Sequence, residues 1–221
     1  MQKAYELLVF DWDGTLMDSE SRIVNCMRAA ITDLDLELPD DSSISNIIGL
    51  GLKEAICMLF TGADEVMVKE VTERYRHHFL YENTTPTPLF SGAEETLHRL
   101  KSEGYLLAVA TGKGRPGLNK VLSHSGLDMV FHTTRCADDA FSKPHPDMLL
   151  QILDELGVQA TDALMIGDTE YDMQMANNAG TAALAVSYGV HSVERLLQHK
   201  PEGCLNAVSE IPDWLSRKSS F

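Results

Sequence analysis

Cysteine, basic residues and long apolar runs are all scarce in this chain of 221 residues. Its four cysteines have no C-x-x-C spacing, so neither a disulfide framework nor a zinc cluster is predicted. No stretch approaches the roughly 18 consecutive apolar residues that a membrane helix needs. The early apolar run Leu7–Phe10 ends at Asp11 and does not look like a secretion signal. We therefore expect a cytoplasmic protein.

Positive charge is also in short supply. The formal net charge is -15, and the isoelectric point of the sequence is about 4.8. Nucleic acids and anionic membranes bind proteins through basic faces, so we expect neither as a partner. An anionic small molecule would be repelled as well, unless its site carried a metal ion or a well-placed lysine.

Short apolar runs and helical patterns alternate along most of the chain. Unbroken runs of this length are typical of strands buried on both faces of a parallel sheet. The alternation predicts a doubly wound, Rossmann-like α/β fold. The predicted strands are Leu7–Phe10, Leu106–Ala110, Ala163–Ile166 and Ala182–Val186, with Val130–Thr134 as a weaker fifth. The helices predicted between them are Ala93–Ser102, Leu118–Ser125, Pro146–Leu156 and Asp172–Ala179.

One region interrupts this alternation. Between Met17 and Pro86 the sequence has helical patterns and no good strand. We expect three or four helices there, which form an all-helical domain inserted into the α/β fold. The predicted domains are this insert, residues 17–86, and a catalytic α/β core of residues 1–16 and 87–221. The helical patterns cover Glu20–Leu34, Ile44–Phe60 and Asp64–Tyr81.

Polar and glycine residues follow the first three clear strands at once. The carboxyl ends of parallel strands share one edge of a sheet, where ligands bind. Segments more than 150 residues apart are therefore expected to meet in one crevice. These segments are Asp11-Trp12-Asp13-Gly14-Thr15, Thr111-Gly112-Lys113 and Gly167-Asp168-Thr169-Glu170-Tyr171-Asp172.

Four carboxylates gather at this edge: Asp11, Asp13, Asp168 and Asp172. Two unit charges 4 Å apart repel by about 4 kcal/mol at an effective dielectric constant near 20. Either raised pKa values or a bound cation must offset this repulsion. Carboxylate oxygens suit a hard ion, so the cluster predicts Mg²⁺ in preference to zinc or copper.

Two further segments predict binding of an anion. Lys143 precedes Pro144 where a helix begins, and a lysine held there could pair with the carboxylates and with phosphate oxygens. Thr111, with the backbone N–H groups of Gly112 and Lys113, would form an anion-binding turn at the start of the next helix.

Together these segments resemble the four motifs of the haloacid dehalogenase-like superfamily, in order. The resemblance covers about residues 5–190, and the insert resembles the helical cap of phosphoglycolate phosphatase-like members. The motifs are Asp11-x-Asp13-Gly14-Thr15-Leu16, Thr111-Gly112, Lys143-Pro144 and Gly167-Asp168-x-x-x-Asp172, and Gly49-Leu50-Gly51-Leu52-Lys53 resembles a glycine loop of that cap.

The resemblance implies roles for the acidic residues. Asp11 would attack the phosphorus atom and form an aspartyl-phosphate. Asp13 would protonate the leaving oxygen and then deprotonate the water that hydrolyses this intermediate. Mg²⁺ would be held by the Asp11 carboxylate, the Asp13 backbone carbonyl and Asp168, with Asp172 nearby or acting through water.

The resemblance also implies phosphate-binding residues and a function. Thr111, Gly112, Lys113 and Lys143 would bind the phosphoryl oxygens, and Lys143 would be catalytic as well. The expected enzyme is a phosphatase that acts on a small phosphorylated metabolite, such as phosphoglycolate, a sugar phosphate, a nucleotide or pyrophosphate. We expect a monomer or a homodimer.

Other functions stay open at this point. A phosphosugar mutase would use the same nucleophile, although Thr15 favours a phosphatase. A phosphonate hydrolase would need a Schiff-base lysine, for which Lys53 is the candidate. A non-catalytic binding module would not need a nucleophile at all. A dehalogenase is disfavoured, because the dehalogenases that the chain resembles lack an acid at the position of Asp13. Candidate substrate contacts from the insert are Arg22, Lys53, Arg74 and Arg76.

Overall fold

A six-stranded parallel sheet forms the centre of the protein. The structure, a computed structural model, describes residues 3–218. The strands run in the order β3-β2-β1-β4-β5-β6, which confirms the predicted doubly wound α/β fold. They are β1 (Leu7–Phe10), β2 (Leu106–Thr111), β3 (Thr133–Cys136), β4 (Ala163–Gly167), β5 (Ala182–Val186) and β6 (Cys204–Leu205).

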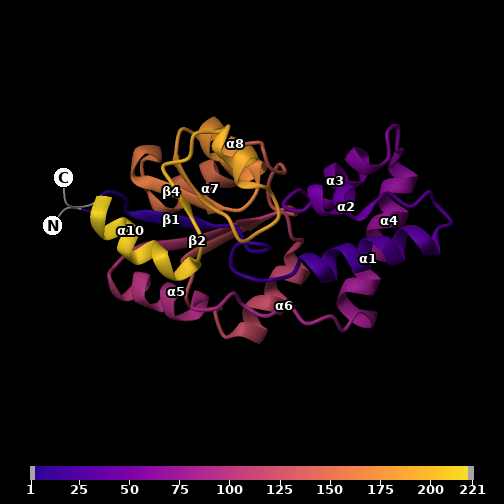
Figure 1. The fold of residues 1–221 in the computed structure, drawn as a ribbon, viewed down its shortest axis with the longest axis horizontal. Helices are drawn as coiled ribbons and strands as arrows, with labels where there is room; N and C mark the ends of the chain where they lie inside the picture. Colours follow the sequence, from indigo (N-terminus) through magenta and orange to yellow (C-terminus); the bar gives the residue numbers. More distant parts are fainter. Residues whose placement is uncertain (1–2, 219–221) are drawn as a thin grey trace.

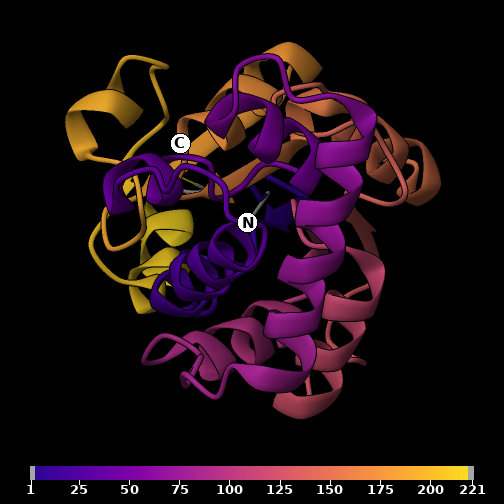
Figure 2. The same ribbon diagram turned by 90° about the vertical axis from the view of Figure 1, so that its right-hand side faces the viewer.

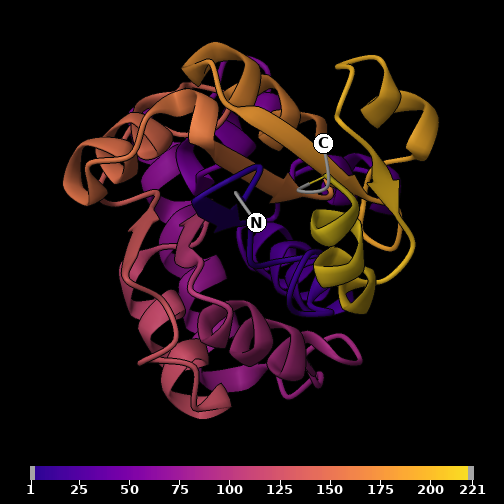
Figure 3. The same cartoon turned by 90° about the vertical axis from the view of Figure 1, so that its left-hand side faces the viewer.

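Helices cover both faces of the sheet, because side chains of consecutive strand residues point to opposite faces. Leu8 and Phe10 of β1 belong to the apolar core under one helical layer, and Leu7 and Val9 to the core under the other. The layers lie below and above the sheet in Figure 1, and the view from the opposite end shows the same sandwich (Figure 3). The first layer comprises α5 (Ala93–Ser102), α6 (Arg115–Ser125) and α10 (Ile211–Lys218); the second comprises α7 (Asp147–Leu156), α8 (Glu170–Ala179) and α9 (Val193–Leu197).

The order of the strands creates a crevice beside β1. The chain adds β2 and β3 on one side of β1, then crosses to add β4 and the later strands on the other side. Ligands bind at the carboxyl ends of the strands beside such a switch point. Phe10, the last residue of β1, pairs with Val109 of β2 and with Ile166 of β4. The residues that follow these three strands therefore lie next to one another.

The helices between β1 and α5, termed the insert, lie beyond the carboxyl ends of the strands (Figure 1). The insert is on the right in Figure 1 and nearest the viewer in Figure 2. It packs around a third apolar cluster, which includes Met27, Ile44 and Ile56 and is joined from the core by Tyr171. No helix within residues 3–218 is long and apolar enough to cross a membrane. The helices of the insert are α1 (Glu20–Asp33), α2 (Asp41–Asn46), α3 (Leu52–Leu59) and α4 (Glu65–His77), which continues into the π-helical turn η1 (His78–Glu82).

The helical pattern Ile44–Phe60 is divided into two helices, α2 and α3, so the region contains four α-helices, within the three or four that were predicted. Gly49 between them has a φ of 100°, a left-handed conformation that an α-helix cannot contain and that glycine adopts at little cost. The loop of residues 47–51 crosses towards the core instead of continuing a helix.

Two differences concern the edge strands. The predicted strand Val130–Thr134 is placed too early, since β3 covers Thr133–Cys136. Val130 and Phe131 are buried in the core beside α6 instead of pairing in the sheet. The two-residue strand β6 was not predicted, because a strand so short has no readable hydrophobic period.

Candidate active site

Asp11 follows β1 directly and is fully buried. Its Oδ1 accepts a hydrogen bond from the backbone N–H of Trp12 at 2.7 Å and lies 2.9 Å from Lys143 Nζ. Its Oδ2 is buried without a hydrogen-bond partner among the described residues. Burial is the main reason why the pKa of Asp11 lies well above its ordinary value. Asp11 is thus a buried carboxyl group with one oxygen still available.

Lys143 lies between two of the acids. Its Nζ is 2.9 Å from Asp11 Oδ1 and 2.6 Å from Asp172 Oδ1, and the lysine is buried. Burial alone would lower the pKa of Lys143, but the two carboxylates outweigh this and raise the pKa above its ordinary value. The lysine is therefore charged, and it compensates only part of the acidic cluster.

Asp168 and Asp172 come from the end of β4 and the first turn of α8. Asp168 accepts hydrogen bonds from Thr15 Oγ1 at 2.7 Å and from the Val190 N–H at 2.9 Å. Burial, followed by the charge of Asp172, raises the pKa of Asp168 to about 7. Asp172 Oδ2 accepts from the N–H of Thr169 at 3.0 Å and from its Oγ1 at 2.6 Å.

These three acids fit a hard cation. One carboxylate oxygen from each of Asp11, Asp168 and Asp172 lies within 4.8 Å of the other two. The unpartnered Asp11 Oδ2 and the raised pKa values of Asp11 and Asp168 show that negative charge is left uncompensated. Oxygen-only ligation of this kind suits Mg²⁺. Both oxygens of Asp168 and both oxygens of Asp172 already have polar partners, so among the described residues Asp11 Oδ2 is the oxygen of these three acids that has no partner.

Asp13 turns away from this cluster and into the crevice. Its carboxylate accepts from Lys113 Nζ at 2.7 and 2.9 Å and from Ser19 Oγ at 2.5 Å. Ser19 is the N-cap residue of α1, yet its side chain makes no capping hydrogen bond. The sequence did not predict either contact of Asp13, because a serine before a helix is typical of an ordinary cap.

The segment after β2 brings the core and the insert together. Thr111 is buried, and its Oγ1 accepts from the Lys113 N–H at 3.2 Å. The Lys113 N–H therefore already donates a hydrogen bond within the turn, whereas the sequence predicted that it would be free to bind an anion. A Cβ on Gly112 would clash with the carbonyl oxygens of Gly49 and Leu50. Only glycine at this position lets the loop of residues 47–51 approach the core so closely.

The first segment is packed against Asp168 as well. Gly14 has a φ of 80°, and a Cβ there would collide with the Asp168 carboxylate. Thr15 donates to that same carboxylate. Trp12, between the two acids, is fully buried and packs edge-on against Phe131, with ring centroids 6.2 Å apart. The contact of the Thr15 hydroxyl with Asp168 was not predicted from the sequence, because the two residues are 153 positions apart.

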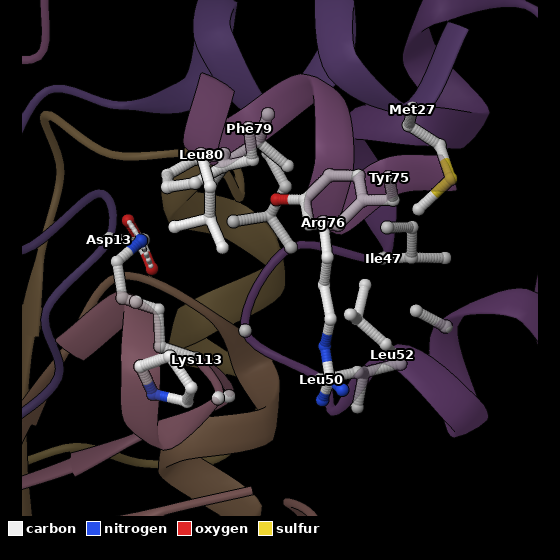
Figure 4. A pocket seen from close by; sticks show the side chains of 18 residues that line it. Asp13, Met27, Ile47, Leu50, Leu52, Tyr75, Arg76, Phe79, Leu80 and Lys113 are labelled. Atoms are coloured by element: carbon white, nitrogen blue, oxygen red, sulfur yellow. Dashed lines mark hydrogen bonds and ion pairs between the residues drawn. The ribbon is translucent and has the colours of Figure 1, made fainter. Parts of the chain in front are cut away.

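A cavity opens beside Asp13 and Lys113, between the core and the insert. Figure 4 shows these two side chains on one side and Met27 and Ile47 on the opposite side. Of the cationic residues suggested as substrate contacts, Arg76 lines this cavity and Lys53 lines a neighbouring one. The site thus combines an acidic floor from the core with a pocket whose walls come largely from the insert.

Comparison with known proteins matches this geometry to a family. The profile of the family described as haloacid dehalogenase-like hydrolase matches residues 8–186. The chain is 35% identical over 209 residues to a Dickeya dadantii protein named Probable phosphatase IndB, covering 93% of this chain and 91% of that protein. It is 28% identical to a Colwellia psychrerythraea phosphoglycolate phosphatase, covering 93% of this chain and 95% of the relative.

The fold has close counterparts among solved structures. The crystal structure of a predicted phosphatase from Clostridium acetobutylicum superposes with a TM-score of 0.86 at 28% identity, covering 96% of this chain and 99% of that one. The expected resemblance to phosphoglycolate phosphatase-like members is confirmed. The chain belongs to the haloacid dehalogenase-like hydrolase family.

Proposed function

We propose that this hydrolase is a Mg²⁺-dependent phosphatase, which hydrolyses a small phosphate monoester through a phosphorylated Asp11. The observation that carries the proposal is the state of Asp11. One oxygen of its buried carboxylate is held by Lys143 and by the Trp12 N–H, and the other has no hydrogen-bond partner within residues 3–218. The names of the relatives, a phosphatase and a phosphoglycolate phosphatase, support this enzyme class.

In the first half of the proposed reaction, Asp11 Oδ2 forms a bond to phosphorus and the bond from phosphorus to the alcohol oxygen breaks. Asp13 gives that oxygen its proton. Asp13 suits this role because its carboxylate is separate from the cluster and faces the crevice, where Ser19 and Lys113 orient it.

In the second half, Asp13 takes a proton from a water molecule, which attacks the phosphorus. The bond between phosphorus and Asp11 then breaks and inorganic phosphate leaves. Thr111, Gly112, Lys113 and Lys143 are the residues that we assign to the phosphoryl oxygens. Lys143 supports this assignment best, since its charge is buried beside Asp11 and would neutralise the group attached there.

The residues that would hold Mg²⁺ are Asp11, Asp168 and the backbone carbonyl of Asp13, with Asp172 nearby or acting through water. When bound, the ion would supply the positive charge that Lys143 alone leaves missing, and it would stabilise the charge that develops on the phosphoryl group. Thr15 and Val190 support this assignment, because their hydrogen bonds fix both oxygens of Asp168.

The proposal includes a division of labour between two domains. Residues 1–16 and 87–221 form the core that carries the chemistry, and residues 17–86 form a cap that selects the substrate. Separate apolar clusters in the core and the insert support this division. All four cysteines are free, which suits a reducing compartment such as the cytoplasm.

Hydrolysis of p-nitrophenyl phosphate by the purified protein tests the chemistry. We expect activity with Mg²⁺, loss of activity with EDTA and recovery when Mg²⁺ is restored. Asp11→Asn should lower kcat by at least about 10⁴-fold, as loss of a nucleophile does. Asp128→Asn is the matched control, since Asp128 is exposed and remote from the crevice. Full activity in Asp11→Asn would exclude Asp11 as the nucleophile, and activity that EDTA does not change would exclude the metal.

A further inference from the structure

The cavity beside Asp13 has mostly apolar walls. Aliphatic side chains from α1, from α3 and from the loop of residues 47–51 line it, and aromatic side chains from α4 and η1 complete it. Figure 4 shows these side chains around the same space. The lining residues include Met27, Ile47, Leu52, Tyr75, Phe79 and Leu80.

The cationic side chains that line this cavity, Lys113 and Arg76, already have anionic partners. Lys113 Nζ contacts both oxygens of Asp13 and lies 4.7 Å from the centre of the Phe79 ring. Arg76 is half-exposed and lies 3.4 Å from Asp138. Arg22 does not line the cavity; it donates to the Phe79 carbonyl at 2.7 Å, and its Nε is buried without a hydrogen-bond partner among the described residues. Among residues 3–218, no lining side chain offers an unpaired positive charge to a second anionic group of a substrate.

Tyr75 is the uncharged polar group in these walls. Burial, followed by the charge of Asp13, raises the pKa of Tyr75 well above its ordinary value. Its hydroxyl therefore stays protonated and can donate one hydrogen bond. The Tyr75 and Phe79 rings are stacked, with centroids 5.8 Å apart and planes 27° apart. They offer a flat apolar surface to a bound group.

The cavity also limits the size of that group. Its volume is about 100 Å³, compared with the roughly 150 Å³ of a protein cavity known to hold benzene. A single ring or a short branched chain fits such a space when part of it extends towards the crevice. A phosphoryl group placed on Asp11 would leave the rest of the ester pointing past Asp13 into this space.

We infer that the enzyme prefers phosphate monoesters whose alcohol part is compact, uncharged and largely apolar, and that it discriminates against alcohols carrying a second negative charge. This inference rests on the proposed phosphatase function and adds the class of leaving group. It separates the chain from its relative named phosphoglycolate phosphatase. A carboxylate in this cavity would have to take a cation from Asp13, from Asp138 or from a backbone carbonyl, and would otherwise stay buried without a partner.

The test compares benzyl phosphate with 2-phosphoglycolate as substrates of the wild-type enzyme with Mg²⁺. Both release an unactivated primary alcohol, so a difference in rate reports the pocket and not the leaving group's intrinsic reactivity. We expect kcat/KM to be about 10- to 100-fold higher for benzyl phosphate, with most of the difference in KM.

A charge-insertion variant sharpens the test. Leu52 is partly exposed and lines the cavity at the start of α3, so Leu52→Arg would place a guanidinium in the cavity without emptying the core. We expect it to shift the ratio of the two kcat/KM values by at least about 10-fold towards 2-phosphoglycolate. Val66→Arg is the matched control, because Val66 is an exposed apolar residue on α4 outside the cavity. Its ratio should equal that of the wild type.

The outcomes separate the two proposals. Hydrolysis of both esters with 2-phosphoglycolate preferred, or a ratio that Leu52→Arg leaves unchanged, overturns the leaving-group inference and leaves the phosphatase function intact. If neither these esters nor p-nitrophenyl phosphate is hydrolysed, the phosphatase function fails, and the leaving-group inference fails with it. Preference for benzyl phosphate together with the shift in Leu52→Arg supports both.

Discussion

The floor of the crevice consists of ionisable side chains, whereas its wall consists mostly of apolar side chains. The floor carries Asp11, Lys143 and Asp168, which are buried and ionisable; Lys143 contacts Asp11, and Thr15 donates to Asp168. The wall carries Met27, Ile47 and their apolar neighbours. Under the proposed function, this difference would let the core determine which bond is broken and the insert determine which alcohol leaves.

The largest expected effect comes from removing the floor's cation. Lys143→Met leaves Asp11 and Asp172 buried together without their shared partner. Breaking a buried ion pair from one side typically costs about 3–5 kcal/mol of stability, and loss of a cation at a transferring phosphoryl group lowers kcat by roughly 10³- to 10⁵-fold.

Urea unfolding and steady-state kinetics measure the two effects of Lys143→Met. Lys69→Met is the control, since Lys69 is exposed on the insert, and its free energy of unfolding should change by less than about 0.5 kcal/mol. A Lys143→Met protein with wild-type stability and kcat would show that the floor does not depend on this charge.

Asp13→Asn should have the next largest effect. The amide keeps the shape of the side chain but cannot exchange a proton, so we expect kcat to fall by about 10²- to 10⁴-fold with little change in KM. This split between kcat and KM is expected of the floor alone. If Asp13→Asn instead raised KM and left kcat unchanged, Asp13 would contribute to substrate binding and not to proton transfer.

Removal of Mg²⁺ should reveal the uncompensated charge of the floor as a dependence of stability on pH. The pKa of Asp168 is raised to about 7 from its ordinary value of 3.8, so the folded protein binds more protons than the unfolded chain between these values. In EDTA the contribution of Asp168 to the free energy of unfolding should therefore be largest below pH 4, and it should fall as the pH rises towards 7.

Saturating Mg²⁺ should oppose this loss of stability. At a concentration of 100 times Kd, a ligand that binds only the folded protein adds about 2.7 kcal/mol to the free energy of unfolding. For a chain of this size, each added kcal/mol raises Tm by about 2–4 °C. Scanning calorimetry at pH 5 and pH 7.5, with Mg²⁺ and with EDTA, measures both effects. A Tm that does not respond to Mg²⁺ at pH 7.5 would contradict a cation site at Asp11 and Asp168.

The smallest expected effect belongs to the wall. Leu80→Ala shortens a partly exposed side chain that lines the cavity. We expect kcat/KM for benzyl phosphate to fall by about 10-fold, mostly through KM, while hydrolysis of 2-phosphoglycolate changes little. An equal loss for both substrates would mean that Leu80 shapes the floor rather than the pocket.

The sequence predicted the floor far better than the wall. Asp11, Asp13 and Asp168 follow strands whose parallel order could be read from unbroken apolar runs, so the topology alone brings them to one edge. Contacts such as Ser19 with Asp13 could not be read, because a hydroxyl that accepts from a helix and one that donates to a carboxylate look the same in sequence.

The wall was not predicted because side chains such as Ile47 and Met27 share the helical spacing of ordinary core residues. Periodicity gives the apolar face of a helix but not whether that face meets another helix or an open cavity. The division of the helical pattern Ile44–Phe60 has a similar origin. Its apolar spacing continues through Gly49, so periodicity alone does not show that α2 ends at Asn46 and that Gly49 has a left-handed backbone conformation.

Gly112 links the position of the pocket wall to the position of the active-site floor. Its missing methyl group sets the spacing between the carbonyl groups of Gly49 and Leu50 and the end of β2. Any larger residue there would push the loop of residues 47–51 away from the end of β2, and with it the part of the pocket wall that this loop forms. Under the proposed function, the absence of one side chain at position 112 thus fixes the distance between the substrate pocket and the nucleophile.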